Sequence, residues 1–472
     1  MKNREKRLIQ NTIIVAFGKI CTKFINFFLL PLYTAVLSTS EYGIVDLLNT
    51  YISLLLPIFF LQIDQAVFRY LIDCRDDKNE TKKIISTVFI TVISQIFLYS
   101  VVYFFISLFI DNSYKYFLMT NVAAIIISNI LLEITRGMGD NINYSIASLI
   151  SGSGTIILNV LFLTVFKFGV TGMLLAVLIS NILCSLYLLV TKKIYNYVSI
   201  YSFDKNVLKK LLKYSIPMVP NQLSWWIVNT SDRTIITYFL GVAFNGIYSA
   251  ANKLSAICIT FFGIFNLTWS ESASISIRDR DSSSYISGIV NKSLKICICL
   301  CLLIISLMPF MFKFLITGKE YSSAYEQIPI LMISTIFSIL VSLLGSIYVA
   351  LKKTKEIAKT SILAAVINIV INILLIKYIG LYAASISTLI AYLAMSIYRY
   401  LDIQKYINIR LDFRFLLHSF ICSIFILFFY YSKIKILNAI TLGITLLFTY
   451  IYCRDTLIQL MCIFLKKIKK FN

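Results

Sequence analysis

Cationic and amide side chains lie deep inside the first apolar stretch of the chain. Lys19 and Lys23 are four residues apart, so on a helix they share one face, which also carries Asn26. At the rise of an α-helix they lie roughly 13 and 20 Å into that stretch. Ionisable groups at such depth in a membrane indicate a functional site by default. Two cations about one turn apart suit an anionic group such as a pyrophosphate.

Three other apolar stretches carry similar polar groups. The following residues complete the candidate substrate-binding set: Asn49, Gln222, Trp225, Trp226, Asn229, Arg233, Asn252 and Lys253. Three carboxylates, Asp46, Asp64 and Asp232, are candidates for coupling transport to an ion. We interpret these stripes as the lining of a water-filled cavity with surplus positive charge, which favours an anionic, polar cargo such as a phosphorylated sugar lipid. The alternative is structural ion pairing of Asp232 with Lys19, or of Asp46 with Lys253.

Sequence motifs of enzymes are absent. The chain has no P-loop, no HExxH, no nucleophile elbow and no long loop with an acidic pair. Its ten cysteines are scattered apart from Cys297, Cys299 and Cys301, and His418 is its single histidine. We therefore expect no catalytic residue, no metal site and no cofactor. The net charge of +22 is spread over short joints, so we expect no nucleic-acid partner.

The elements that carry these residues are long apolar helices. Of the 472 residues 59% are hydrophobic and 14% charged, and the apolar residues form blocks long enough to span a bilayer. This predicts an all-α membrane protein with about fourteen transmembrane helices. The expected spans are 10–36, 42–68, 84–110, 115–135, 143–166, 169–190, 213–240, 242–270, 292–316, 326–350, 356–377, 380–400, 413–432 and 435–453.

The basic residues predict the orientation of these spans. With an inside N-terminus, the inner segments hold 33 Lys and Arg, the outer joints hold seven, and four lie inside helices. This asymmetry follows the positive-inside rule. We expect a multi-pass protein of the cytoplasmic (inner) membrane with both termini in the cytoplasm.

Weak internal repeats divide the chain. Residues 40–44 (SEYGI) match 244–248 (FNGIY), and 167–172 (KFGVTG) match 378–383 (YIGLYA), which places Gly169 on Gly380. The similar shifts predict two six-helix bundles, residues 1–200 and 201–407, related by a pseudo-two-fold axis along the membrane normal. Helices 13 and 14 and a basic cytoplasmic tail, residues 408–472, follow them.

At residues 231–236 (SDRTII), 240–241 (LG) and 245–253 (NGIYSAANK) the chain resembles the signature of polysaccharide-exporting flippases. Residues 265–270 (FNLTWS) and 40–43 (SEYG) are similar to further parts of that pattern. These proteins form the oligosaccharide flippase branch of the multidrug/oligosaccharidyl-lipid/polysaccharide exporter superfamily. The resemblance implies alternating access that moves an undecaprenyl-pyrophosphate-linked repeat unit to the outer leaflet, for O-antigen, capsule or other surface polysaccharide.

The resemblance also implies partners and leaves rival functions open. The cargo is a lipid-linked oligosaccharide within membrane lipids, and a polysaccharide polymerase and glycosyltransferases are possible partners. The lysine-rich set argues mildly against a peptidoglycan lipid-precursor flippase, whose cavity relies on arginines. Its positive charge disfavours a cation-coupled drug exporter. A membrane polymerase or glycosyltransferase would need the acidic loop that is missing.

Overall fold

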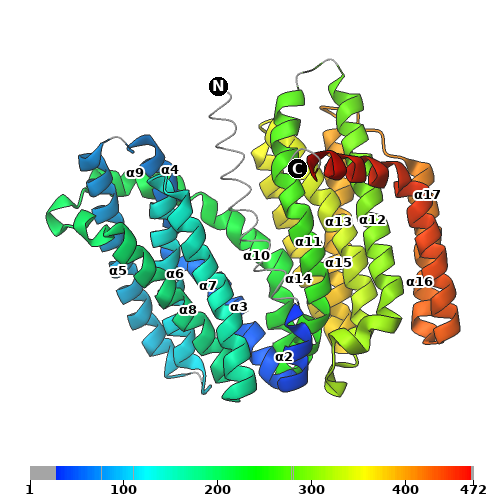
Figure 1. Ribbon diagram of the computed structural model, residues 1–472, viewed down its shortest axis with the longest axis horizontal. Helices are drawn as coiled ribbons and strands as arrows, with labels where there is room; N and C mark the ends of the chain where they lie inside the picture. Colours follow the sequence, from blue (N-terminus) through cyan, green and yellow to red (C-terminus); the bar gives the residue numbers. More distant parts are fainter. Residues whose placement is uncertain (1–27, 76, 110, 278, 280, 469–472) are drawn as a thin grey trace. The chain divides into compact units, whose positions relative to one another are not determined.

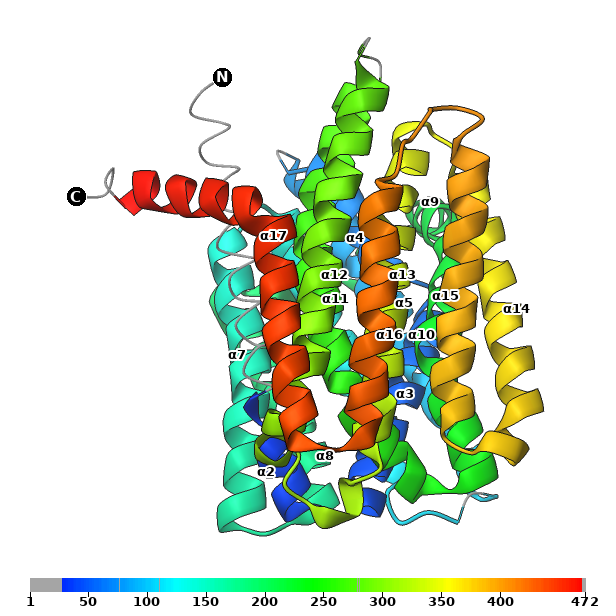
Figure 2. The same cartoon turned by 90° about the vertical axis from the view of Figure 1, so that its right-hand side faces the viewer.

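The computed structural model describes residues 28–75, 77–109, 111–277, 279 and 281–468. The chain divides into two compact units, Met1–Thr234 and Ile235–Asn472. Every regular element of the described residues is helical. Figures 1 and 2 show these helices running side by side within each unit.

The first unit is built around one central helix. Its elements are α2 (Leu30–Val36), α3 (Thr39–Phe60), α4 (Ile63–Asp73), α5 (Lys78–Ser107), α6 (Lys115–Gly137), α7 (Asn141–Val160), a π-helical turn (Leu161–Val165), α8 (Gly169–Lys192), the short 3-10 turns η2 (Ile194–Tyr197) and η3 (Ile200–Ser202), α9 (Lys205–Ser215) and most of α10 (Met218–Leu240). Helix α6 packs against α3, α4, α5, α7 and α8. It is the fourth expected span.

The second unit also has a central helix. Its elements are α11 (Val242–Ser276), α12 (Ser282–Leu315), η4 (Lys319–Tyr321), α13 (Ala324–Ala350), α14 (Thr354–Ile379), α15 (Tyr382–Ile403), α16 (Phe413–Ser432) and α17 (Lys435–Ile468). Helix α13 packs against α11, α12, α14 and α15, while α16 and α17 pack against α12. The central α13 is the fourth span of the second predicted copy. The repeat itself stays a prediction.

Side-chain caps begin several of these helices. Ser38 and Glu41 form a reciprocal capping box at the start of α3, in which the Ser38 hydroxyl accepts from the Glu41 amide at 3.3 Å. Asp77, Asp140, Asp204 and Asp412 each accept backbone N–H groups at the start of α5, α7, α9 and α16. Joints of a few residues can therefore end one span and begin the next.

The membrane-spanning character of the helices is confirmed. In the described part, ten helices are long and apolar enough to cross a bilayer, and α11 makes an eleventh if its two parts, Val242–Gly263 and Thr268–Ser276, are one bent span. The more polar α10 and α15 are also of spanning length. With the expected first span, of which the described residues include only the end, the number agrees with about fourteen.

The second expected span, 42–68, is wrong as one continuous helix. The chain leaves the helix at Leu61 and Gln62, which adopt left-handed φ values of 52° and 55°, and α4 starts at Ile63. Pro57 lies in the last turn of α3, and its carbonyl accepts the Leu61 amide at 3.2 Å. The last expected span, 435–453, agrees with the apolar stretch Lys435–Arg454, and α17 continues beyond it to Ile468.

Candidate functional site

Polar contacts join α3 to the first part of α10. Nε of Arg233 donates to Oδ2 of Asp46 at 2.7 Å. About two turns away along both helices, the Trp226 indole N–H is shared between the Thr50 carbonyl and the Ser53 hydroxyl, each at 3.1 Å. The two contacts are seven residues apart on each helix and run in opposite directions, so they lie about 10 Å apart on antiparallel helices.

The ion pair of Asp46 and Arg233 is sheltered from solvent. The side chains are 15% and 14% exposed, and Nη1 of Arg233 also donates to the Asn229 carbonyl at 3.1 Å. Pairing at such burial compensates the desolvation of both charges. It differs from both pairings suggested by the sequence, since Asp46 meets Arg233 rather than Lys253. Arg233 is therefore neutralised and does not add to a surplus of positive charge.

The same two helices, α3 and α10, carry exposed hydrogen-bonding side chains. Asn49 and Ser53 on α3 are exposed, as are Gln222 and Asn229 on α10, and Trp225 is half-buried. The Asn229 amide donates to the Trp225 carbonyl at 2.8 Å. Amides and indoles at a membrane-spanning helix pair can hydrogen-bond sugar hydroxyls and pack against sugar rings.

The other two candidate carboxylates lie in different surroundings. Asp232 is buried, with 2% of its surface exposed. Asp64 lies in the first turn of α4, directly after the break, and its Oδ2 accepts the Gln65 side-chain amide at 3.0 Å. Neither shares the Asp46–Arg233 contact.

The remaining candidates are not brought to this contact by the described residues. Lys19, Lys23 and Asn26 lie outside the described part of the chain. Asn252 and Lys253 lie on α11 in the second unit and are half-buried. Their place in one common site stays a prediction.

The positive-inside count places Arg399, at the end of the expected span 380–400, among the inner basic residues, and so misses a buried cation of the second unit. Arg399 is 1% exposed on α15 and bonds only neutral oxygens among the described residues. Its Nη1 donates to the Val341 carbonyl at 2.8 Å, and its Nε donates to the Thr360 hydroxyl at 3.0 Å. Gly345 provides the space, since a Cβ there would lie 2.9 Å from Nη1. The signal was available in the apolar pattern, which continues to Ile403.

One turn further on, a second polar group extends this cluster. The Tyr348 hydroxyl donates to Oδ2 of Asp402 at 2.8 Å, and Lys405 donates to the other carboxylate oxygen at 2.8 Å. Tyr348 is fully buried. Arg399 and Asp402 therefore link α15 to α13 and α14 through hydrogen bonds.

Two helical units with many membrane-spanning helices and charged pairs inside them define a multi-pass α-helical membrane protein. Residues 8–269 match the model of a family described as polysaccharide biosynthesis protein. The chain belongs to this family. A search of curated proteins finds no match.

Solved structures show the same fold. The lipid II flippase MurJ in an inward closed conformation superposes with a TM-score of 0.68 at 17% identity, over 94% of this chain and 100% of that one. An inward-facing multidrug resistance MATE transporter of the MOP superfamily gives 0.65 at 14% identity, over 80% and 93%. A MOP superfamily transporter from Pyrococcus furiosus gives 0.54 at 14% identity, over 84% and 96%. The expected family and fold class are thus confirmed.

Proposed function

We propose that this protein flips undecaprenyl-pyrophosphate-linked oligosaccharide repeat units from the inner to the outer leaflet of the cytoplasmic membrane, for surface polysaccharide biosynthesis. Membership of the polysaccharide biosynthesis family and the transporter fold support this proposal. The observation that carries it is the sheltered Asp46–Arg233 pair with exposed amides beside it on α3 and α10. A neutral, hydrogen-bonding surface of this kind suits a sugar chain better than a hydrophobic drug.

The roles of the cations divide between structure and cargo. Arg233 is neutralised by Asp46, so recognition of the pyrophosphate falls to Lys19, Lys23 and Lys253. The sugars contact Asn26, Asn252 and the residues beside the ion pair, which are Asn49, Gln222, Trp225, Trp226 and Asn229. Alternating access exposes this set first to the inner and then to the outer side.

The ion pair between Asp46 and Arg233 also bears on which carboxylate couples transport to an ion. A carboxylate that couples transport must gain and lose its proton or cation during the cycle. Asp46 is engaged in its 2.7 Å ion pair with Arg233. Asp64 and the buried Asp232 remain candidates for this role.

A second candidate function is flipping of a peptidoglycan lipid precursor, and the likeness in fold to the lipid II flippase, over 94% of this chain and 100% of that one, favours it. Both cargoes combine a polyprenyl pyrophosphate with sugars. They differ in the peptide, and the described α3–α10 contact offers no second cation for peptide carboxylates.

The test is complementation in two strains, one lacking its repeat-unit flippase and one depleted of its peptidoglycan-precursor flippase. We expect the protein to restore surface polysaccharide in the first strain and not growth in the second. The Asn49→Ala/Asn229→Ala double variant should reach normal membrane levels but lower polysaccharide about ten-fold or more, since each amide hydrogen bond contributes about 1 kcal/mol.

The matched control is Asn196→Ala, which removes an exposed amide from η2 away from the α3–α10 contact. It should export normally. Rescue of the second strain alone would replace the proposed cargo by the peptidoglycan precursor. Normal export by the double variant would remove the amides from the cargo site.

A further inference from the structure

The segment between α8 and α10 has an unusual combination of charge and exposed apolar surface. It includes η2, η3 and α9, and α9 carries four lysines and no acidic residue in its eleven positions. In Figure 1 α9 lies across the row of helices at the end where α4 and α5 meet, and in Figure 2 it is seen nearly end-on. It is therefore oriented across the spanning helices rather than along them.

Helix α9 has two distinct faces. Leu211 is fully buried, and α9 packs on α4 and α5 through this apolar side. Tyr214 makes an edge-on ring contact with Tyr70 of α4, with centroids 6.1 Å apart. All four lysines are exposed and lie on the opposite side: Lys205, Lys209, Lys210 and Lys213. They spread positive charge over about 12 Å of helix.

The loop before α9 covers the lipid-facing side of α5. The Ser86 hydroxyl donates to the Tyr197 carbonyl at 2.7 Å and accepts the Ser199 amide at 3.0 Å. Ser86 shares one helical face with Ile93 and Phe97, seven and eleven residues further on, which are 60% and 72% exposed. Large apolar side chains on this face of a spanning helix meet lipid tails. The loop therefore lies about 10 Å from Ile93 toward the start of α5, where lipid gives way to water.

At this level the loop exposes large side chains of its own. Ile200 is 80% exposed and Tyr201 is fully exposed. Aromatic and aliphatic side chains gather at the boundary between acyl chains and headgroups. Their exposure here is explained by contact with the membrane surface.

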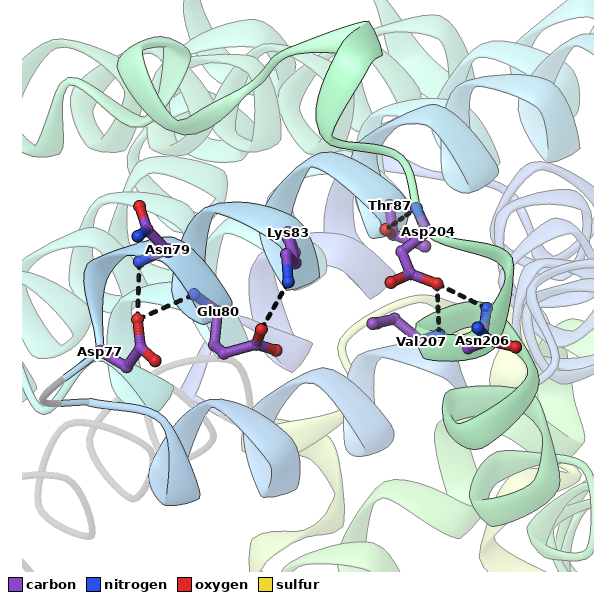
Figure 3. Close-up of polar contacts among 8 residues, drawn as sticks. All are labelled: Asp77, Asn79, Glu80, Lys83, Thr87, Asp204, Asn206 and Val207. Carbon is purple, nitrogen blue, oxygen red and sulfur yellow. Dashed lines mark hydrogen bonds and ion pairs between the residues drawn. The ribbon is translucent and has the colours of Figure 1, made fainter.

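The acidic residues of this region are engaged elsewhere, as Figure 3 shows. Asp77 caps α5 by accepting the Asn79 and Glu80 amides. Asp204 caps α9, while its own amide donates to the Thr87 hydroxyl at 3.1 Å. Glu80 pairs with Lys83 at 2.7 Å. None of these carboxylates forms an ion pair with the four α9 lysines within the described residues.

We infer that the segment from η2 to α9 is a membrane-surface anchor that binds anionic phospholipid headgroups. Ile200 and Tyr201 insert at the boundary of the bilayer, and the four lysines of α9 hold phosphate-bearing headgroups of the same leaflet. Charge complementarity selects the ligand, since basic residues near a membrane surface attract anionic lipids.

The test measures lipid selectivity of the full-length protein reconstituted into phosphatidylcholine vesicles. Electron paramagnetic resonance of spin-labelled phosphatidylglycerol and phosphatidylcholine gives the relative association constant at the protein surface. For Lys205→Gln/Lys209→Gln/Lys210→Gln/Lys213→Gln we expect the preference for phosphatidylglycerol to fall by about five-fold or more. High salt should produce the same loss in the parent protein through screening.

A charge-matched variant provides the control: Lys167→Gln/Lys313→Gln/Lys319→Gln/Lys435→Gln. These lysines are also exposed but lie in other joints, so this variant should keep the preference. Millimolar glycerol phosphate should not compete, because a soluble phosphate lacks the membrane contact. Unchanged preference in the α9 variant, competition by glycerol phosphate, or preference for undecaprenyl pyrophosphate over phosphatidylglycerol would each overturn the inference. None of these outcomes depends on the proposed transport activity.

Discussion

Residue by residue, the sheltered contact of Asp46 with Arg233 is the most consequential pairing in the first unit. The pair forms a strong charge-assisted hydrogen bond at 2.7 Å, which offsets the hydration that both groups lose on burial. Breaking it from one side removes an ionic partner of the other, largely buried charge. Its two residues thus join α3 to α10 whether or not they contact cargo.

We predict that Asp46→Asn and Arg233→Gln each destabilise the protein by about 3 kcal/mol, because each removes one side of a sheltered ion pair. Thermal unfolding of the purified protein in detergent measures the loss. The exchanged pair, Asp46→Arg with Arg233→Asp, should recover part of it, whereas Asn49→Ala on the exposed side of α3 should change stability little. Equal stability of parent and single variants would contradict a structural role.

The Arg399 cluster gives a prediction for Gly345→Ala. A new Cβ would lie 2.9 Å from Nη1 of Arg399 and displace it from the Val341 carbonyl. We expect a loss of about 1–3 kcal/mol in unfolding free energy, because a buried donor loses its acceptor. Thermal unfolding of Gly345→Ala, Arg399→Lys and their combination measures the coupling between the two positions.

The matched control is Gly288→Ala on α12. A Cβ there meets nothing within 4 Å, so the variant should be neutral or more stable by up to about 1 kcal/mol through helix propensity. If both glycine variants behave alike, or the effects of Gly345→Ala and Arg399→Lys add fully, the proposed crowding is absent.

Among the elements, α3 and α4 show how one apolar stretch becomes two helices. Both pack against α6, but the chain departs from the helix at Leu61 and Gln62. Left-handed backbone is unfavourable for residues other than glycine, so surrounding packing must hold it. The break places Asp64 in the first turn of a new helix, where its Oδ2 accepts the Gln65 side-chain amide.

The start of α7 offers a test of how charge and cap combine. Asp140 accepts the Asn143 amide at 3.1 Å and pairs with Lys192 at the end of α8. Asp140→Asn keeps the capping acceptor and loses only the ion pair, so we expect a cost near 0.5 kcal/mol. Asp140→Ala loses both and should cost about 1–2 kcal/mol. Chemical or thermal unfolding distinguishes them; equal losses would show that the cap contributes nothing.

The same aspartate gives this contact a pH dependence. Burial raises the pKa of Asp140, but hydrogen bonds from Lys192 and Asn143 outweigh it and lower the pKa to about 2. The stabilisation is therefore complete above the unfolded pKa of about 3.9 and is lost as the pH falls from there toward 2. The stability difference between parent and Asp140→Asn should shrink over this range.

For the whole molecule, the alternation of charge predicts a topology that reporter fusions can check. Residue 80 and residue 200 lie at the same end of the first unit, since Ser86 bonds Tyr197. We expect fusions after residues 80, 200 and 470 to be active in the cytoplasm and fusions after 113 and 434 to be active outside. External activity after residue 470 would contradict the proposed position of the C-terminus.

Much of the fold could be predicted from the sequence because membrane spans depend on local properties. Hydropathy and helix length located the spans, and apart from 42–68 the differences lie at helix ends. The repeat match of Gly169 and Gly380 also has a local physical basis, since both adopt positive φ, 55° and 57°, where helices meet. Glycine is suited to this conformation.

The sequence by itself determined the class of the protein, the family resemblance and the presence of charged groups inside the spans. It did so because bilayer thickness, helical period and residue type are encoded in short stretches of chain. Only the tertiary structure decided that Asp46 meets Arg233, 187 residues away, and that Arg399 lies within a helical core. Such pairings depend on which helix faces pack together, and in a chain with many similar apolar helices no local pattern selects among the possible partners.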